Sequence, residues 1–273
     1  MLKTFAVIGD PIDHSLSPAI HNAAYRQLNL ECAYIGYKIQ RAELPSGIES
    51  LKAIKISGFN VTIPHKIEIM KFLDEFDDNC KLIGAANTIV NDNGLLKGYN
   101  TDMDGFLEPI KKRDISIKGS NVLLIGAGGA SRAIIAGLGK EHVKKISIIN
   151  RTLEKANELG NFARKIGIKT DILPLENALE LNDDYNFIVN ASSLGLKNES
   201  NLIPPKIMNE KTVVYDIVYK PINTELIKDA KSKNSQIIYG HEMLLEQAVR
   251  SFEIWLKQKA PYDAMKKVIL GKF

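Results

Sequence analysis

Short apolar runs of strand length alternate with helical segments along the whole chain. Residues 2–9, 58–64 and 122–125 are such runs, and the continuously apolar run 122–125 is typical of a strand buried on both faces of a parallel sheet. Residues 131–138 instead indicate a helix with an apolar face, and a long helix is expected over 240–257. Alternation in two successive blocks predicts an α/β protein with two doubly wound domains and a cleft between them.

The central pattern is a strand, a glycine-rich turn and a helix. Residues 126–129 (Gly-Ala-Gly-Gly) follow the strand, and Ser131 opens the helix. Glycines allow a tight turn with no Cβ to obstruct a ligand, and a helix N-terminus directs free N–H groups and its positive dipole end at an anion. The pattern predicts the pyrophosphate site of a dinucleotide fold. A glycine turn without a ligand is the alternative, since Ser131 stands where a third glycine is usual.

The next strand, residues 145–149, ends at Asn150-Arg151-Thr152. At this point a carboxylate holds the ribose 2′-hydroxyl of NAD, whereas an arginine accommodates the 2′-phosphate of NADP. The chain offers Arg151, with Lys155 one turn on, and the nearest acid, Glu154, is expected inside the following helix. These residues favour NADP. The alternative is a solvated charge at Arg151 beside an N-cap at Thr152.

Two polar positions in the first block have both a local and a chemical explanation. Lys66 follows the apolar run 58–64 and is expected in the first turn of a helix, where the dipole disfavours a cation. It is either a surface lysine or a group for acid–base work. Asp102 precedes the expected helix 103–113 and is either its N-cap or part of a site.

The junction after the first strand is rich in hydrogen-bonding side chains. Ser17 and Pro18 are expected to cap and begin a helix. Capping does not explain Ser15, His14 or the pair His21-Asn22, and ligands bind at such junctions in open α/β sheets. Farther on, residues 84–90 and 95–99 are expected to pair as a hairpin through the turn Asn91–Gly94.

Composition narrows the class of protein without naming a function. The chain has 273 residues, 45% hydrophobic and 25% charged, with a net charge of +4, which is typical of a globular protein with one large or two ordinary domains. The charge is too mild and scattered for nucleic acid. Residues 1–9 are expected to form a strand rather than a signal peptide, and no stretch approaches the length of a membrane span. Cys32, Cys80 and the five histidines match no metal spacing, so we expect no metal and a reduced, cytoplasmic setting.

Several separated motifs, in a fixed order, resemble those of the shikimate dehydrogenase family over nearly the whole chain. They are Gly9-x-Pro-x-x-His-Ser-x-Ser-Pro18, Asn60-Val-Thr-Ile-Pro-His-Lys66, Gly84-Ala-Ala-Asn-Thr88, Asn100-Thr-Asp102, Gly126-Ala-Gly-Gly-Ala130, Asn150-Arg-Thr152, Asp216-x-x-Tyr-x-Pro221 and Gly240-x-x-Met-Leu-x-x-Gln247-Ala.

The resemblance implies an NADP-dependent oxidoreductase that reversibly reduces 3-dehydroshikimate to shikimate in chorismate and aromatic amino-acid biosynthesis. It implies a catalytic pair, Lys66 and Asp102, that moves a proton while hydride passes to or from the nicotinamide. The implied substrate ligands are Ser15 and Ser17 for the carboxylate, Thr62, Asn87, Asp102 and Gln247 for the ring hydroxyls, and Tyr219 and Lys66 beside them. The implied nucleotide contacts are Gly126, Ala127, Gly128, Gly129, Ala130, Asn150, Arg151, Thr152, Ile217, Gly240 and Met243.

The resemblance also implies a discontinuous substrate domain, residues 1–101 with 241–273, and a Rossmann-type NADP domain, residues 102–240. The expected partner is a small-molecule substrate, with no nucleic acid and no membrane, in a monomer or homodimer. Two departures from the usual motifs are Ser192, where threonine is commoner, and the polar pair His241-Glu242 before Met243. Two alternatives stay open: a quinate/shikimate dehydrogenase that uses NAD, and a non-catalytic NADP-binding regulator.

Overall fold

The computed structural model describes residues 2–182, 184–196 and 201–272 and has the α/β architecture that the sequence predicts. The chain forms two compact units, residues 1–105 with 245–273 and residues 106–244. Each division falls a few residues beyond the predicted domain boundary, within the helices α4 (Thr101–Lys111) and α8 (Gly240–Leu256).

The first unit is built on a mixed sheet with the strand order β2-β1-β3-β5-β6-β4. Strands β1, β2 and β3 are mutually parallel, and the hairpin β5–β6 adds an antiparallel strand next to β3. The predicted hairpin is confirmed, and Asn93 (φ 52°) and Gly94 (φ 98°) form its turn in the left-handed region that these residues tolerate. The strands are β1 (Lys3–Gly9), β2 (Cys32–Lys38), β3 (Gly58–Val61), β4 (Glu75–Phe76), β5 (Thr88–Asp92) and β6 (Leu95–Tyr99).

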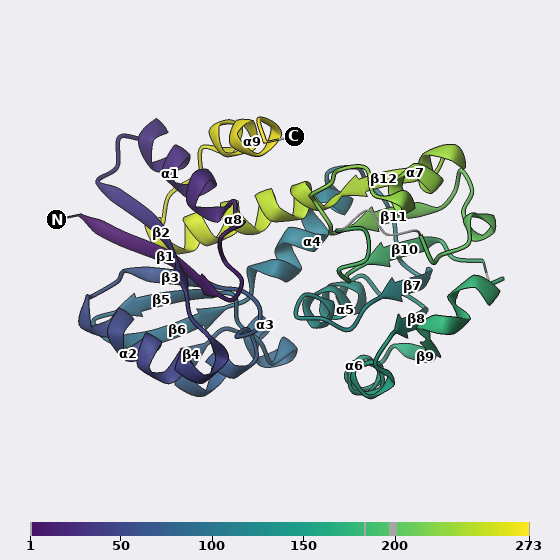
Figure 1. The fold of residues 1–273 in the computed structure, drawn as a ribbon, viewed down its shortest axis with the longest axis horizontal. Helices are drawn as coiled ribbons and strands as arrows, with labels where there is room; N and C mark the ends of the chain where they lie inside the picture. The colour runs from purple at the N-terminus through teal and green to yellow at the C-terminus, as the bar shows by residue number, and fades with distance from the viewer. Residues whose placement is uncertain (1, 183, 197–200, 273) are drawn as a thin grey trace. The chain divides into compact units, whose positions relative to one another are not determined.

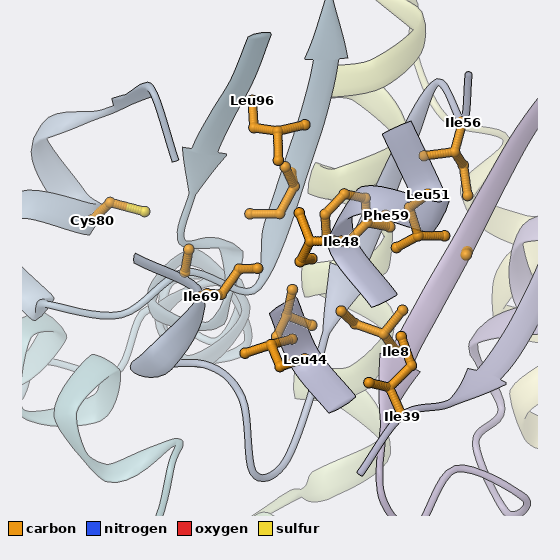
Figure 2. Close-up of a cluster of buried hydrophobic side chains, with 14 residues drawn as sticks. Ile8, Ile39, Leu44, Ile48, Leu51, Ile56, Phe59, Ile69, Cys80 and Leu96 are labelled. Atoms are coloured by element: carbon orange, nitrogen blue, oxygen red, sulfur yellow. The ribbon is translucent and has the colours of Figure 1, made fainter. Parts of the chain in front are cut away.

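Alternate residues of β1 face two different layers, which explains why this strand is apolar throughout. Ala6 and Ile8 belong to a buried cluster with Leu44, Ile48 and Leu51 of α2 (Leu44–Ala53), which covers one face of the sheet (Figure 2). On the other face, Phe5 packs against Tyr25 of α1 (Ser17–Gln27) and Trp255 of α8. Figure 1 shows α1 and α2 on opposite sides of this sheet. The other helical segments of this unit are α3 (Asp78–Ile83) and α9 (Tyr262–Leu270), with short 3₁₀ turns at Arg41–Glu43 and Glu68–Phe72.

The second unit contains a wholly parallel sheet with the strand order β9-β8-β7-β10-β11-β12. Numbered from β7, this is the order 3-2-1-4-5-6 of a dinucleotide-binding fold, with its switch point between β7 and β10. The strands are β7 (Asn121–Ile125), β8 (Lys145–Asn150), β9 (Lys169–Pro174), β10 (Phe187–Asn190), β11 (Val213–Asp216) and β12 (Gln236–Tyr239), and the helices are α5 (Ser131–Lys140), α6 (Leu153–Lys165) and α7 (Glu225–Ser232), with 3₁₀ turns at Leu175–Glu180 and Pro205–Ile207.

Candidate active site

The predicted substrate residues of the first unit collect at one edge of its sheet. Strands β1 and β3 are parallel and neighbours, so the loops that follow them start side by side. Strand β5 runs against β3, and its first residue, Thr88, pairs with Asn60 near the end of β3. Strand β6 returns to the same edge before α4 begins. The topology therefore brings together segments that are far apart in sequence: residues 10–17, 62–66, 87 and 100–102.

Gly9 is required where the first two of these loops meet. A Cβ at Gly9 would lie only 2.3 Å from Thr62 Cγ2 and 2.8 Å from the Ile63 carbonyl oxygen. The backbone N–H of Asp10 donates to that same carbonyl at 2.9 Å. The glycine thus lets the loop that carries Ser15 and Ser17 lie directly against Thr62.

Lys66 lies in a turn, so the prediction that it occupies the first turn of a helix is wrong. The next helical segment is the 3₁₀ turn Glu68–Phe72. The Lys66 carbonyl accepts a bond from the Ala86 N–H at 2.8 Å instead of from a helical neighbour. The buried His65 ring adds an anchor, since its Nε2 lies 2.7 Å from the Ile39 carbonyl and donates to it. Tertiary bonds therefore determine this backbone.

Lys66 and Asp102 form a close and largely buried ion pair. Lys66 Nζ donates to Asp102 Oδ2 at 2.5 Å, and the two side chains are only 14% and 7% exposed. Asp102 lies in the first turn of α4, but its carboxylate bonds Lys66 rather than capping its own helix. The Asn100 side chain instead accepts from the Asp102 N–H at 3.2 Å. An ammonium in contact with a carboxylate at a loop edge can give or take a proton.

Asn87 orients the other oxygen of this carboxylate. Its Nδ2 donates to Asp102 Oδ1 and to Thr101 Oγ1, both at 2.9 Å. Its Oδ1 accepts from the Thr101 N–H at 2.7 Å. These bonds use both amide donors, so in this structure Asn87 acts first on Asp102.

The two serines lie on the loop and helix that follow β1. Ser15 is half-buried, and its Oγ accepts from the Ser17 N–H at 3.3 Å. Ser17 begins α1 at its first helical position, whereas Leu16 occupies the N-cap, so the expected side-chain cap by Ser17 is absent. Burial raises the pKa of the Tyr34 phenol well above its usual range, and a hydrogen bond with Ser17 opposes that rise.

Gln247 lies on α8 in the first unit, one turn before Ser251, whose Oγ donates to the Gln247 carbonyl at 2.9 Å. Tyr219, in contrast, follows β11 in the second unit. It is half-buried, and burial raises the pKa of its phenol.

The glycine-rich turn lies at the switch point of the second sheet. Gly126 has φ 99°, and a Cβ there would lie 2.7 Å from Ser192 Cβ and 2.9 Å from the Ser192 backbone. Glycine is required here for two reasons: residues with a side chain rarely adopt this left-handed backbone, and a Cβ would collide with Ser192. The turns after β7 and β10 thus lie against each other where the strand order reverses, which is where dinucleotides bind in this strand order.

Side chains close this turn and leave two donors open. Ser131 Oγ donates to the Gly126 carbonyl at 3.0 Å and accepts from the Gly128 N–H at 3.1 Å. Asn150 Oδ1 accepts from the Ala127 N–H at 3.1 Å. Among the described residues, the N–H groups of Gly129 and Ala130 have no partner, and they precede the N-terminus of α5. The turn therefore leaves two backbone donors for an anion such as a dinucleotide phosphate.

Arg151 extends from the end of β8 into solvent. Its side chain is exposed, and no acidic residue in the described part of the chain forms a salt bridge with it. Thr152 occupies the N-cap position of α6, but its side chain accepts no bond from the helix. A guanidinium held in the open here can take a phosphate in a two-point contact.

Gly240 begins α8 against the end of β11. A Cβ there would lie 2.2 Å from the Ile217 carbonyl oxygen and 2.9 Å from that of Asp216, so only glycine fits. Met243 is buried. Glu242, which sequence reasoning noted only as unusually polar, accepts from the Tyr239 N–H at 3.0 Å and forms a salt bridge with Arg113 at 2.8 Å.

The fully buried Asp216 ties the end of β11 to the end of β10. Its carboxylate accepts from Asn190 Nδ2 at 2.9 Å, the Val218 N–H at 3.0 Å and Thr224 Oγ1 at 2.6 Å. Burial raises the pKa of this carboxyl to about 6, and the hydrogen bonds from Thr224, Val218 and Asn190 oppose the rise.

We expect this carboxyl to make stability fall as pH rises. A folded pKa near 6 exceeds the unfolded value of about 4, so the folded state holds the extra proton between these values and loses that advantage above pH 6. Asp216→Asn has no such proton. The unfolding free energy of the wild type minus that of Asp216→Asn should therefore increase by up to about 3 kcal/mol from pH 7 to pH 4. Urea titrations at several pH values measure it, and a constant difference would contradict the assignment.

No group of three or more His, Cys, Asp or Glu side chains within residues 2–182, 184–196 and 201–272 is placed to hold a metal ion. Over the same ranges, no helix is both long and apolar enough to cross a membrane.

Three family models match successive parts of the chain. Residues 7–89 match the shikimate dehydrogenase substrate binding domain, and residues 109–218 match the shikimate/quinate 5-dehydrogenase model. Residues 240–270 match the shikimate 5′-dehydrogenase C-terminal domain. The matched ranges contain most of the predicted site residues, although Asp102 and Tyr219 fall between them.

Relatives and solved structures match over the full length. The chain is 64% identical over 273 residues to the shikimate dehydrogenase (NADP(+)) of Nitrosopumilus maritimus, covering 100% of both chains, and 38% identical to that of Bacillus subtilis, covering 100% of this chain and 98% of the relative. It is similar to the Thermus thermophilus shikimate 5-dehydrogenase in complex with NADP(H) and shikimate, with a TM-score of 0.87, 32% identity and 100% of both chains covered. It is also similar to the Listeria monocytogenes enzyme in complex with shikimate and NAD, with a TM-score of 0.90, 32% identity, and 98% of this chain and 96% of that chain covered.

Proposed function

The chain belongs to the shikimate dehydrogenase family, and we propose on this premise that it reversibly reduces 3-dehydroshikimate to shikimate with NADPH. This is a step of chorismate and aromatic amino-acid biosynthesis. One observation carries the proposal: the ion pair of Lys66 and Asp102, 2.5 Å apart and largely buried at the edge where the substrate loops meet. A regulator that only binds a nucleotide does not transfer protons and does not need an acid–base pair.

Lys66 is the proton donor in the direction of reduction. The residues of the second unit would hold NADPH, which would supply the hydride for the ketone carbon. The ammonium of Lys66 polarises the ketone oxygen and stabilises the negative charge that develops there, and it gives that oxygen a proton. Asp102, held by Asn87, keeps the ammonium in place, and after the transfer the neutral amine of Lys66 regains a proton from water. The two groups therefore act together in the proton transfer.

The first unit is the substrate domain in this proposal, and the second unit binds NADP. Hydroxyl donors suit a carboxylate, and amide or carboxylate partners suit ring hydroxyls. The proposed substrate set is Ser15, Ser17, Thr62, Lys66, Asn87, Asp102, Tyr219 and Gln247. The proposed NADP set is Gly126, Ala127, Gly128, Gly129, Ala130, Asn150, Arg151, Thr152, Ile217, Gly240 and Met243. Three members of this set shape the site. The Ala127 N–H donates to the Asn150 side chain, so neither group is free for the nucleotide. Gly240 leaves room for the Ile217 carbonyl, which a Cβ at this position would meet.

The choice of NADP follows from Arg151, and the relatives named for NADP(+) support it. The NAD-dependent quinate/shikimate alternative is less consistent with the chain, because no acid follows β8 directly. The proposal further includes a cytoplasmic location, which the unpaired thiols of Cys32 and Cys80 suit. It also includes a monomer or homodimer that binds no nucleic acid.

Initial rates with shikimate and with quinate, each with NADP⁺ and with NAD⁺, test this proposal. We expect rapid turnover only for shikimate with NADP⁺. Turnover of quinate or use of NAD⁺ would be compatible with the proposed roles of Lys66 and Asp102 but would contradict the proposed substrate or cofactor specificity. Binding of NADP⁺ without turnover of either substrate would favour a regulator.

A further inference from the structure

Three buried hydroxyls of the first unit lie close to one another: Thr88 at the start of β5, Thr101 at the start of α4 and Ser251 in the second half of α8. We call them the hydroxyl cluster. Thr88 and Ser251 are 0% exposed and Thr101 is 1% exposed. Ser251 Oγ lies 2.8 Å from Thr88 Oγ1 and 3.2 Å from Thr101 Oγ1. Three elements that are distant in sequence thus meet at one serine.

The direction of these bonds follows from the single proton of each hydroxyl. Ser251 donates to the Gln247 carbonyl at 2.9 Å, one turn earlier in its own helix. The 2.8 Å contact with Thr88 therefore needs Thr88 as the donor. Asn60 Nδ2 also donates toward Ser251 Oγ, at 3.2 Å. Ser251 Oγ thus accepts hydrogen bonds from both Thr88 and Asn60.

We propose that Ser251 is a positioning residue for the reaction: its hydroxyl joins the helix that carries Gln247 to the bonds through which Thr101 and Asn87 orient Asp102. Ser251 itself contacts neither Lys66 nor Asp102 in the described structure. It acts through Thr101, which bonds Asn87, and Asn87 donates to Asp102 Oδ1 at 2.9 Å. The inference rests on the proposed function, since Gln247 and Asp102 matter only if the substrate is bound there.

Loss of the Ser251 hydroxyl has a specific consequence for this chain of bonds. Asn87 Oδ1 lies 3.2 Å from each of the Thr88 and Thr101 hydroxyls, so in the intact protein it shares their protons with Ser251 Oγ. That oxygen also accepts the Thr101 N–H at 2.7 Å. Without the competing Ser251 hydroxyl, the bonds from the two threonines to Asn87 Oδ1 would strengthen, pull the Asn87 amide away from Asp102 and loosen the carboxylate. The Gln247 backbone would lose its bond from Ser251 in the same step.

Ser251→Ala, Ser251→Thr and Ile254→Val test the proposal together. Ile254→Val is the matched control, because Ile254 is a buried residue of the same helix and the change removes only hydrocarbon. We expect Ser251→Ala to lower kcat/KM for shikimate by about 5- to 30-fold, the factor that loss of one or two buried hydrogen bonds implies. The KM for NADP⁺ should stay unchanged. Ser251→Thr restores the hydroxyl and should recover most of the loss.

The outcomes separate this inference from the function on which it rests. A wild-type enzyme that does not oxidise shikimate refutes the proposed function and the positioning role with it. An active wild type whose Ser251→Ala variant loses no more kcat/KM than Ile254→Val refutes the positioning role alone. So does a variant in which the KM for NADP⁺ rises in step with the loss, or one that Ser251→Thr fails to rescue although it melts at the wild-type temperature.

Discussion

Replacement of Lys66 by alanine is expected to lower kcat by roughly two to four orders of magnitude, which is the usual contribution of a positioned acid–base group. The ammonium is the described cation in contact with Asp102, and alanine leaves neither a proton donor nor a positive charge for the developing oxyanion. The substitution also leaves the carboxylate of Asp102, 7% exposed, without its cation. We therefore expect a loss of stability of about 1–3 kcal/mol as well.

Kinetics and melting must be measured on the same samples, so that the two effects stay separate. Lys97→Ala is a suitable control: Lys97 belongs to the same unit, its side chain is 44% exposed, and it forms its salt bridge with Glu75 at 3.1 Å. Its kcat should stay at the wild-type value. Asp102→Asn should lower kcat too, and adding it to Lys66→Ala should cost little more, because the two residues act as a unit. Near-normal turnover of the folded Lys66→Ala variant would remove Lys66 from the mechanism.

The local patterns of the chain predict much of this fold because burial enforces them. The run 122–125 became β7 in the middle of a parallel sheet, and the turn Asn91–Gly94 became the predicted hairpin. The short strand β4 pairs only through Glu75 and Phe76, and no alternating pattern of that length stands out in a sequence. The position of β5 beside β3 depends on which edge of the sheet the hairpin joins. This is a long-range contact, and the hydrophobic periodicity of the sequence does not predict it.

The site shows the same division between local and long-range causes. The sequence singled out Lys66 and Asp102, and the structure brings them into contact. The sequence-based prediction that Lys66 lies on a helix is wrong, because the bonds that hold its turn come from Ala86 and Ile39, far away in the chain. Asn150 was expected only among nucleotide contacts, yet it also ties the glycine turn to β8. Ser251 gave no signal at all, since a lone serine in a helix has meaning only beside Thr88 and Thr101.

Replacement of Arg151 by alanine is expected to raise the KM for NADP⁺ by about 10- to 100-fold, the value of one or two charge-assisted hydrogen bonds to a phosphate. The KM for NAD⁺, which lacks the 2′-phosphate, should change little, so the preference between the two cofactors narrows. The geometry supports this split because Arg151 is exposed at the end of β8, and no acidic group of the described chain pairs with it. Initial rates with each cofactor at saturating shikimate measure the effect.

Two further variants distinguish a phosphate contact from a general loss of positive charge. Arg164→Ala removes an exposed arginine of α6 that bonds Asn161 and Thr170 at 2.8 Å each, and it should leave both KM values unchanged. Lys155→Ala, one turn from Arg151, should raise the KM for NADP⁺ less than Arg151→Ala does, since an ammonium contributes a point charge where a guanidinium makes a two-point contact. Equal effects of Arg151→Ala and Arg164→Ala would mean that net charge alone attracts the cofactor. Unchanged kinetics of Arg151→Ala would make Arg151 a surface charge and return the choice of cofactor to other residues at the end of β8.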